Sequence, residues 1–446
     1  MSLKAENVSV PLEEVLDHSN PVLNQVRNID QAAHDWYRFV LSFPPHLVQD
    51  YLKRFEVDRG KNVLDPFCGT GTTVVECKKL GIPGVGTEAN PMAWFAGSVK
   101  LDWTPDPHEL LSIASDIAET TSKKLKRKPA VLRSLPEESL KIILTNSISP
   151  LPLHKSLVLL EQIRKQAGEV YSRHLLLAFA RAVVSSISNL RFGPEVGIGK
   201  PKEDAPVVKD WMREVNWMVG DLKYLQTLEP TPAIIYQADS RQILQVLQPN
   251  SIDVVITSPP YPNEKDYTRA TRLESVLLGF IHNKQELRAL KQGLIRSNTR
   301  NVYKGDTDDL WVANHPEIQR IANEIEARRI ELGKTSGFER AYARTTKLYF
   351  GGMAKHLAEL RHILRPGAYL GYVVGDQASY LRVMIRTGQL LAEIAEELGY
   401  EVVNIDLFRT RLATATGEQL REEVVVLRWT GVMPTNEYRF ILNTPS

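Results

Sequence analysis

Cysteine is scarce in this sequence, and long apolar runs are missing. Of its 446 residues only two, Cys68 and Cys77, are cysteines, and both lie in one short segment. Without a second pair of thiols the chain offers neither a disulfide framework nor a cysteine-based metal site. No apolar run reaches the roughly 18 residues that a membrane-spanning helix needs. We therefore expect a soluble, cytoplasmic protein with free thiols and no membrane partner.

An excess of one charge is also missing. The chain has 55 basic and 53 acidic residues, which gives a formal net charge of +2. Overall charge therefore does not predict binding to nucleic acid, and such binding would depend on local patches. The ten histidines show no spacing typical of metal ligands, so no metal site is predicted.

Helix-like and strand-like segments alternate along much of the chain. Short apolar runs rich in β-branched residues predict strands, and apolar residues three to four apart predict helices. Such alternation is typical of an open, mostly parallel sheet. The last two strands follow one another without a helix, so one of them is expected to be antiparallel. The predicted strands are 61–65, 84–88, 233–239, 251–257, 368–376, 401–408 and 422–429, and the predicted helices include 20–40, 46–55, 72–80, 240–248, 271–281, 349–364 and 386–399.

A glycine-rich loop follows the first predicted strand. Its sequence is DPFCGTGTT, residues 65–73, and a predicted helix begins at its end. Gly69 and Gly71 permit positive φ and a close approach of the backbone to a ligand. The first N–H groups of the helix are available to a polar ligand. The loop matches neither the dinucleotide fingerprint G-x-G-x-x-G nor a phosphate loop, which would need Gly-Lys-Ser/Thr.

Two further predicted strands also end at an acid. Glu88 follows the glycine-rich loop by about 20 residues, where a carboxylate can accept hydrogen bonds from both hydroxyls of an adenosine ribose. Asp239 ends the strand 233–239, where it could accept a hydrogen bond from the adenine amino group. Either acid alone is equally compatible with a cap at the end of a strand. Together with Asp65 they place three acids at strand ends of one alternating fold, which favours a ligand site.

A rigid turn follows the predicted strand 251–257. Its sequence is SPPY, from Ser258 to Tyr261. The two prolines fix φ and remove two N–H donors from the turn. An isolated SPPY is compatible with a simple turn. Behind a buried strand, and in one chain with DPFCGTG, it favours a catalytic role.

The two motifs together resemble those of the amino-methylating DNA methyltransferases. DPFCGTG is similar to the S-adenosylmethionine-binding motif of that family, and TSPPY is similar to its catalytic motif. The segments 365–376 and 422–429 are similar to later strands of the family. The resemblance implies a Rossmann-like class I methyltransferase fold with helical insertions, and S-adenosylmethionine as the cofactor. It assigns cofactor binding to Asp65, Pro66, Phe67, Gly69, Gly71, Thr72, Glu88 and Asp239, and catalysis to Ser258, Pro259, Pro260 and Tyr261.

The SPPY turn suits methylation of an exocyclic amino group. Ser258 and the carbonyl of Pro259 would accept hydrogen bonds from the two amino hydrogens, and Tyr261 would stack on a base flipped out of the duplex. S-P-P-Y resembles the cytosine-N4 enzymes, whereas D- or N-P-P-Y resembles the adenine-N6 enzymes. We therefore favour cytosine N4, with adenine N6 as the alternative, because serine could serve either base. Methylation at carbon 5 is not predicted, since it needs a Pro-Cys nucleophile and Cys68 follows Phe67.

The order of the motifs resembles the alpha arrangement of the family, in which the insertion between them carries target recognition. Two basic segments could meet DNA phosphates. One is KKLKRK, residues 123–128, and the other is 288–304, which also contains Asn298, Asn301 and Tyr303; we favour the second. The loop 192–205 is another candidate. The resulting segments are 1–97 (N-terminal helices and cofactor half of the core), 98–231 (helical insertion, candidate target recognition), 232–281 (catalytic half), 282–342 (second insertion, candidate DNA contact) and 343–446 (C-terminal part of the core).

The sequence thus predicts a site-specific methyltransferase acting on duplex DNA, in partnership with a cognate restriction endonuclease. Three other functions stay open at this point. The first is an RNA amino-methyltransferase, because such enzymes share similar turns. The others are an inactive scaffold that only binds DNA and a dinucleotide-dependent oxidoreductase.

Overall fold

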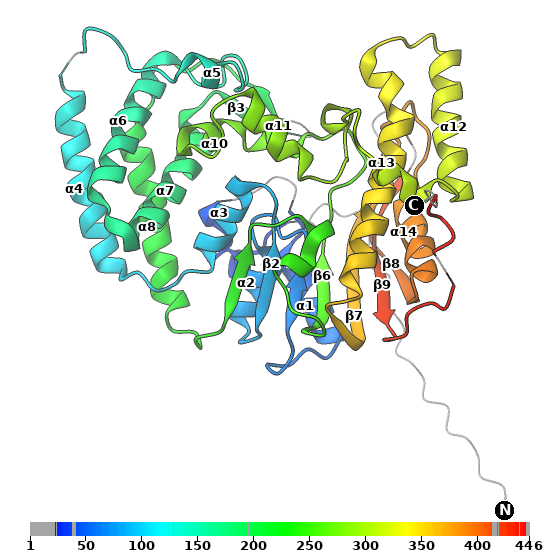
Figure 1. The fold of residues 1–446 in the computed structure, drawn as a ribbon. Helices are drawn as coiled ribbons and strands as arrows, with labels where there is room; N and C mark the ends of the chain where they lie inside the picture. The colour runs from blue at the N-terminus through cyan, green and yellow to red at the C-terminus, as the bar shows by residue number, and fades with distance from the viewer. Residues whose placement is uncertain are drawn as a thin grey trace, which may run out of the picture.

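The protein is built around one seven-stranded sheet. The computed structural model describes residues 23, 25–37, 42–127, 129–193, 196–412, 417, 419–436 and 438–442. The strands of the sheet are β1 (Val63–Asp65), β2 (Gly84–Thr87), β5 (Ala233–Tyr236), β6 (Ile252–Thr257), β7 (Leu364–Gly375), β8 (Tyr400–Leu412) and β9 (Gln419–Trp429). Their order is β5-β2-β1-β6-β7-β9-β8 (Figure 1). A separate hairpin pairs β3 (Leu190–Phe192) with β4 (Val196–Ile198).

The sheet is parallel except at its C-terminal edge. β5, β2, β1, β6 and β7 pair in parallel, whereas β9 runs antiparallel to both β7 and β8. This topology confirms the predicted mostly parallel sheet with an antiparallel strand near the C-terminus, which is a Rossmann-like architecture. The carboxyl ends of β1, β2, β5 and β6 therefore lie at one edge, where α/β folds bind ligands.

Fourteen α-helices surround the sheet within the described residues. They are α1 (Pro45–Arg54), α2 (Thr72–Lys79), α3 (Pro91–Lys100), α4 (Pro107–Leu125), α5 (Glu137–Leu140), α6 (Pro150–Gln166), α7 (Gly168–Ala182), α8 (Val207–Leu225), α9 (Tyr267–Ala270), α10 (Arg272–Leu278), α11 (Lys284–Gln292), α12 (Pro316–Glu331), α13 (Gly337–Leu360) and α14 (Thr387–Glu397). None of the helices in this described part is both long and apolar enough to cross a membrane.

The two faces of the sheet carry different helices because adjacent strand residues point to opposite sides. On one face Val63 and Val254 belong to a buried cluster with residues of α1, such as Val48. On the other face Leu64 and Val255 belong to a cluster that includes α13 and α14. Burial on both faces explains why these strands are short, continuous apolar runs.

The segment between β2 and β5 is mainly helical. α4, α6, α7 and α8 lie beside the β5 edge of the sheet (Figure 1). Their apolar side chains form one buried cluster with residues of α2 and α3, so these helices share a core with the cofactor-side half of the sheet. The loop expected at 192–205 contains Phe192 of β3 and the whole of β4.

Two predicted helices are wrong. The described residues of 20–40 contain only the 3₁₀ turns Asn28–Asp30 and His34–Trp36, and residues 20–22, 24 and 38–40 lie outside the described part. Tertiary hydrogen bonds hold this segment: Trp36 donates from its indole nitrogen to Asp221 of α8 at 2.8 Å. The predicted helix 240–248 is a 3₁₀ helix, Ser240–Gln245, with a kink at Gln242.

Candidate active site

The two predicted loops meet at the carboxyl edge of the sheet. β1 and β6 are neighbouring parallel strands, so the residues that follow them lie side by side. Thr257, at the end of β6, donates a hydrogen bond from its hydroxyl to Asp65 Oδ1 at 2.5 Å. Thr73, in the first turn of α2, donates to the carbonyl of Ile256 at 3.0 Å. These two bonds fix the glycine-rich loop against the strand that leads to Ser258.

A pocket lies between the two loops. Of the residues predicted to bind the cofactor, Asp65 and Gly71 are not in its lining. Of the predicted catalytic residues, Pro259 and Tyr261 line an adjoining pocket instead. The predicted residues in the lining are Pro66, Phe67, Gly69, Thr72, Glu88, Asp239, Ser258 and Pro260. We call this cavity the cofactor pocket.

The two glycines of the loop are needed for different physical reasons. Both have positive φ, +53° at Gly69 and +92° at Gly71. A Cβ on Gly69 would meet no atom within 4 Å, so this glycine leaves open space in the pocket wall. A Cβ on Gly71 would be in ordinary contact, 3.4 Å from the Cα of Gly97 and from a side-chain atom of Ile235, so here the positive φ at the start of α2 is what favours glycine.

Glu88 and Asp65 are the two acids that bond to the glycine-rich loop. Glu88 accepts hydrogen bonds from the N–H groups of Gly69 at 2.8 Å and Asn90 at 2.7 Å, yet burial raises its pKa to about 7. Burial likewise raises the pKa of Asp65 to about 6, against the effect of hydrogen bonds from Thr257 and the N–H of Phe67. The second carboxyl oxygen of Asp65 is buried and has no hydrogen-bond partner among the described residues.

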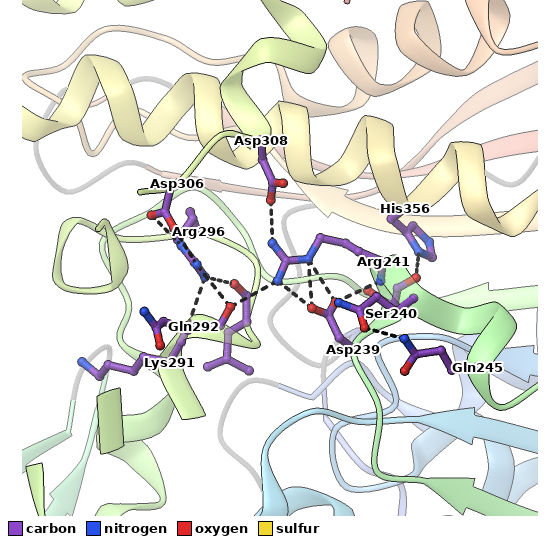
Figure 2. Close-up of polar contacts among 12 residues, drawn as sticks. Asp239, Ser240, Arg241, Gln245, Lys291, Gln292, Arg296, Asp306, Asp308 and His356 are labelled. Carbon is purple, nitrogen blue, oxygen red and sulfur yellow. Dashed lines mark hydrogen bonds and ion pairs between the residues drawn. The ribbon is translucent and has the colours of Figure 1, made fainter. Parts of the chain in front are cut away.

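Asp239 is held by an arginine that the sequence interpretation missed. Arg241 donates from Nε to Asp239 Oδ1 at 3.0 Å and from Nη2 to Oδ2 at 2.6 Å (Figure 2). Its other terminal nitrogen donates to Asp308 at 2.5 Å, and its side chain is almost fully buried. Arg241 thus connects an acid of the cofactor pocket to the second insertion (282–342). Its sequence position, two residues after Asp239, gave no signal of this role.

The SPPY turn opens into a second pocket, which we call the base pocket. Ser258 belongs to both pockets, and its hydroxyl donates to the carbonyl of Val373 in β7 at 3.1 Å. Because this bond uses the hydroxyl hydrogen, the oxygen presents its lone pairs as an acceptor. The N–H of Tyr261 donates to the hydroxyl of Tyr267 at 3.1 Å, which fixes the end of the turn. The base pocket is lined by Ser42, Phe43, Ser258, Pro259, Tyr261, Asn263, Lys265, Tyr267, Val373, Phe408, Arg409 and Glu422.

The second insertion forms one wall of the cofactor pocket, which was not expected. Gly293, Leu294, Ile295, Ser297 and Asn301 all line the pocket. The sequence gave little signal of this, because the segment is polar and rich in basic residues.

The prediction that this basic segment faces DNA phosphates is wrong for several of its residues. Lys291 is buried and pairs with Asp266 at 2.8 Å. Arg296 is buried and pairs with Asp306 at 2.8 Å (Figure 2). Opposite charges elsewhere in the fold therefore neutralise them. Asn298 and Asn301 are buried as well, whereas Arg288, Arg300 and Lys304 are exposed.

Comparisons with known proteins agree with this geometry. Residues 10–93 match the "DNA methylase" family of N6 and N4 methyltransferases. The Type II methyltransferase M.BsoBI of Geobacillus stearothermophilus is 25% identical over 94% of this chain and 88% of its own length. The Type II methyltransferase M.AvaI of Nostoc sp. is 22% identical over 87% of this chain and 83% of its own. The predicted resemblance to the DNA amino-methyltransferases is confirmed.

Solved structures give a weaker likeness. The rRNA methyltransferase aviRa from Streptomyces viridochromogenes covers 93% of this methyltransferase with 92% of its own chain, at 10% identity and a TM-score of 0.29. TrmN from Thermus thermophilus covers 89% with 52% of its own chain, at 11% identity and a TM-score of 0.29. The fold assignment rests on the strand order and not on these likenesses.

The family match implies S-adenosylmethionine as the methyl donor of this methyltransferase. The cofactor pocket fits such a ligand in two respects. The Glu88 carboxyl suits hydroxyl donors, and the missing side chain at Gly69 leaves space for close approach.

Proposed function

We propose that this methyltransferase transfers a methyl group from S-adenosylmethionine to the exocyclic N4 of cytosine in duplex DNA. The observation that carries the proposal is the position of Ser258 in both pockets, with its hydroxyl hydrogen donated to Val373. An amino group in the base pocket would meet an acceptor there, next to the pocket that holds the methyl donor. The Type II methyltransferases among the relatives support a DNA substrate.

In the base pocket the proposed chemistry depends mainly on orientation. The lone pair of an exocyclic amine is delocalised into the ring, so the nitrogen is a poor nucleophile. Ser258 and the carbonyl of Pro259 accept its two hydrogens and direct the remaining electron pair toward the donor's methyl group. Tyr261 stacks on the flipped base, and Pro260 keeps the turn rigid. When bound, S-adenosylmethionine would supply an activated methyl group to the amine held by these residues, with S-adenosylhomocysteine as the leaving group, and the pocket would pass one amino proton to solvent or to an acceptor.

In the cofactor pocket, three acids and the glycine-rich loop bind and orient the donor. Glu88 accepts hydrogen bonds from the ribose hydroxyls. Asp65 is buried behind the glycine-rich loop and orients it through the hydrogen bond from the N–H of Phe67. Asp239 lines the same pocket and is proposed to accept a hydrogen bond from the adenine amino group. Gly69 and Gly71 shape the loop.

The two insertions are proposed to contact DNA. The first insertion (98–231) is the candidate for target recognition, and its exposed basic residues include Lys126 and Arg127 at the end of α4 and Arg191 of the β3–β4 hairpin. Lys128 lies outside the described residues. In the second insertion, Arg288, Arg300 and Lys304 remain candidates for phosphate contacts because they are exposed. We also propose that the methylated site is that of a cognate restriction endonuclease.

The proposed product can be identified without knowing the recognition site. The protein is expressed in cells that lack N4-methylcytosine, and their DNA is digested to nucleosides for mass spectrometry. We expect N4-methyldeoxycytidine in these cells and none in cells with an empty vector. If N6-methyldeoxyadenosine were the only modified nucleoside found, the substrate base would be adenine and not cytosine. Tritium transfer from the cofactor to tRNA or rRNA but not to DNA would contradict a DNA methyltransferase. Sequencing of the modified DNA then maps the target site.

Affinity for S-adenosylmethionine is expected to rise with pH. The pKa of Glu88 is raised to about 7 and that of Asp65 to about 6, so both carboxyl groups become ionised as the pH rises through these values. An ionised Glu88 is the better acceptor for ribose hydroxyls, and an ionised Asp65 is the better acceptor for the loop N–H of Phe67, so binding should be about tenfold weaker at pH 6 than at pH 8. Calorimetry measures this dependence. In Glu88→Gln the change of cofactor affinity near pH 7 should disappear. An affinity that does not depend on pH in the unaltered protein would contradict the role assigned to Glu88.

A further inference from the structure

The wall of the base pocket opposite the SPPY turn is built by the hairpin of β8 and β9. Phe408 and Arg409 of β8 both line the pocket, although neighbouring residues of a strand normally point to opposite faces. The register explains this: Leu407 pairs with Glu423, Arg409 pairs with Glu422, and Phe408 is the extra residue of a bulge. Bulges of this kind redirect side chains and occur next to active sites.

Glu422 holds the Arg409 side chain in place. Arg409 Nε contacts Glu422 Oε2 at 2.6 Å, and Arg411 Nε contacts the other oxygen at 3.4 Å. On the other side Glu422 pairs with Gly375 of β7, where a Cβ would lie 3.2 Å from the Tyr261 ring and from Cγ of Glu422. The arginine is thus tied through one carboxylate to the part of the sheet that supports the turn.

The terminal nitrogens of Arg409 remain as donors at this pocket. Among the described residues, the Arg409 guanidinium makes a hydrogen bond through Nε and none through its two terminal nitrogens. Asn263 and Lys265 also line the pocket, but they lie on the same loop as Ser258. β8 is separated from β6 by β7 and β9, so Arg409 approaches from the side away from Ser258.

We propose that Arg409 is a specificity-determining residue that donates a hydrogen bond to O2 of the flipped cytosine. This inference rests on the proposed function. Cytosine has a carbonyl oxygen at position 2, two ring positions from its amino-bearing carbon. Adenine has a C–H group at the equivalent place beyond N1. A partly buried arginine donor therefore favours cytosine, because it would be left unpaired against adenine.

The test compares protein variants with altered DNA at one position. Arg409→Met keeps the aliphatic part of the side chain and removes the donors, and Arg409→Lys keeps the charge next to Glu422. Arg411→Met is the matched control, since it loses an arginine from the same strand and the same carboxylate but does not line the pocket. Each protein is titrated with a duplex containing the mapped target cytosine, with the same duplex carrying an abasic site there, and with adenine there. Cofactor affinity and thermal unfolding establish that each variant is folded.

We expect Arg409→Met to bind the cytosine duplex about 10- to 100-fold more weakly and the abasic duplex less than about threefold more weakly. The affinity of Arg409→Lys for the cytosine duplex should lie between those of Arg409→Met and the unaltered protein. The ratio of affinities for the cytosine and adenine duplexes should become smaller in both Arg409 variants but not in Arg411→Met. An equal loss on the cytosine and abasic duplexes would overturn the proposal in favour of a phosphate or purely structural role. An unchanged affinity would overturn it as well. If Arg409→Met fails to fold, the lysine variant alone decides. Failure of the proposed function is distinct, since the unaltered protein would then yield no N4-methylcytosine.

Discussion

Replacing Ser258 with alanine is expected to lower kcat by about 10²- to 10³-fold and to leave the affinity for S-adenosylmethionine almost unchanged. The Ser258 hydroxyl gives its hydrogen to the Val373 carbonyl, so its oxygen acts as an acceptor at the junction of the two pockets. Alanine removes this acceptor without disturbing the proline turn. The amino group then loses its orientation toward the donor. Single-turnover methylation and calorimetric titration with the cofactor measure the two quantities separately.

Ser115→Ala is a suitable control for that experiment. Ser115 lies on the exposed side of α4, and its hydroxyl also donates to a backbone carbonyl, that of Leu111 at 2.8 Å. The chemical change is therefore the same, but it occurs away from both pockets. Its kcat should stay within about twofold of the unaltered protein. Equal losses of turnover and cofactor affinity in Ser258→Ala would argue that the serine only shapes the cofactor pocket.

Gly351→Ala is expected to destabilise the protein by about 2 to 4 kcal/mol and to raise the KM for the cofactor. A Cβ at this position in α13 would lie 1.8 Å from the carbonyl oxygen of Asp308, so the backbone of the second insertion must move. Asp308 is the partner of Arg241, and the same insertion supplies a wall of the cofactor pocket. Denaturant unfolding and steady-state kinetics measure the two effects.

Gly220→Ala is the control for Gly351→Ala. Gly220 lies inside α8, and a Cβ there would meet no atom within 4 Å. Alanine should therefore be neutral or stabilise the protein by up to about 1 kcal/mol, as expected for a helix interior. If Gly351→Ala unfolds at the same denaturant concentration as the unaltered protein, the close approach of Asp308 to α13 is wrong.

The parts of the fold that could be predicted are those fixed by local sequence. Buried parallel strands are short apolar runs, and the loops after them contain glycine, proline and acids for reasons of backbone geometry. For this reason the motifs predicted both the sheet and the proximity of Asp65 to the end of β6, from which the SPPY turn begins. The N-terminal helix did not form, because Trp36 and its neighbours bond to distant parts of the chain.

The rest of the site depends on partners that are remote in sequence. Arg296 looks like part of a solvent-exposed basic run, and only the fold brings Asp306 to it. Arg241 likewise meets Asp308 through tertiary packing. The role of Arg409 depends on a bulge whose register is set across the β8–β9 hairpin. None of these contacts leaves a periodic pattern in the sequence.

The second insertion is both a wall of the cofactor pocket and a carrier of exposed arginines. Thermodynamic reciprocity follows from this double position. Whatever binds the outer side of the insertion and shifts it changes cofactor affinity by some factor, and the cofactor must change the affinity of that binder by the same factor. The affinity for the cofactor therefore reports whether a binder on the outer side has shifted the insertion.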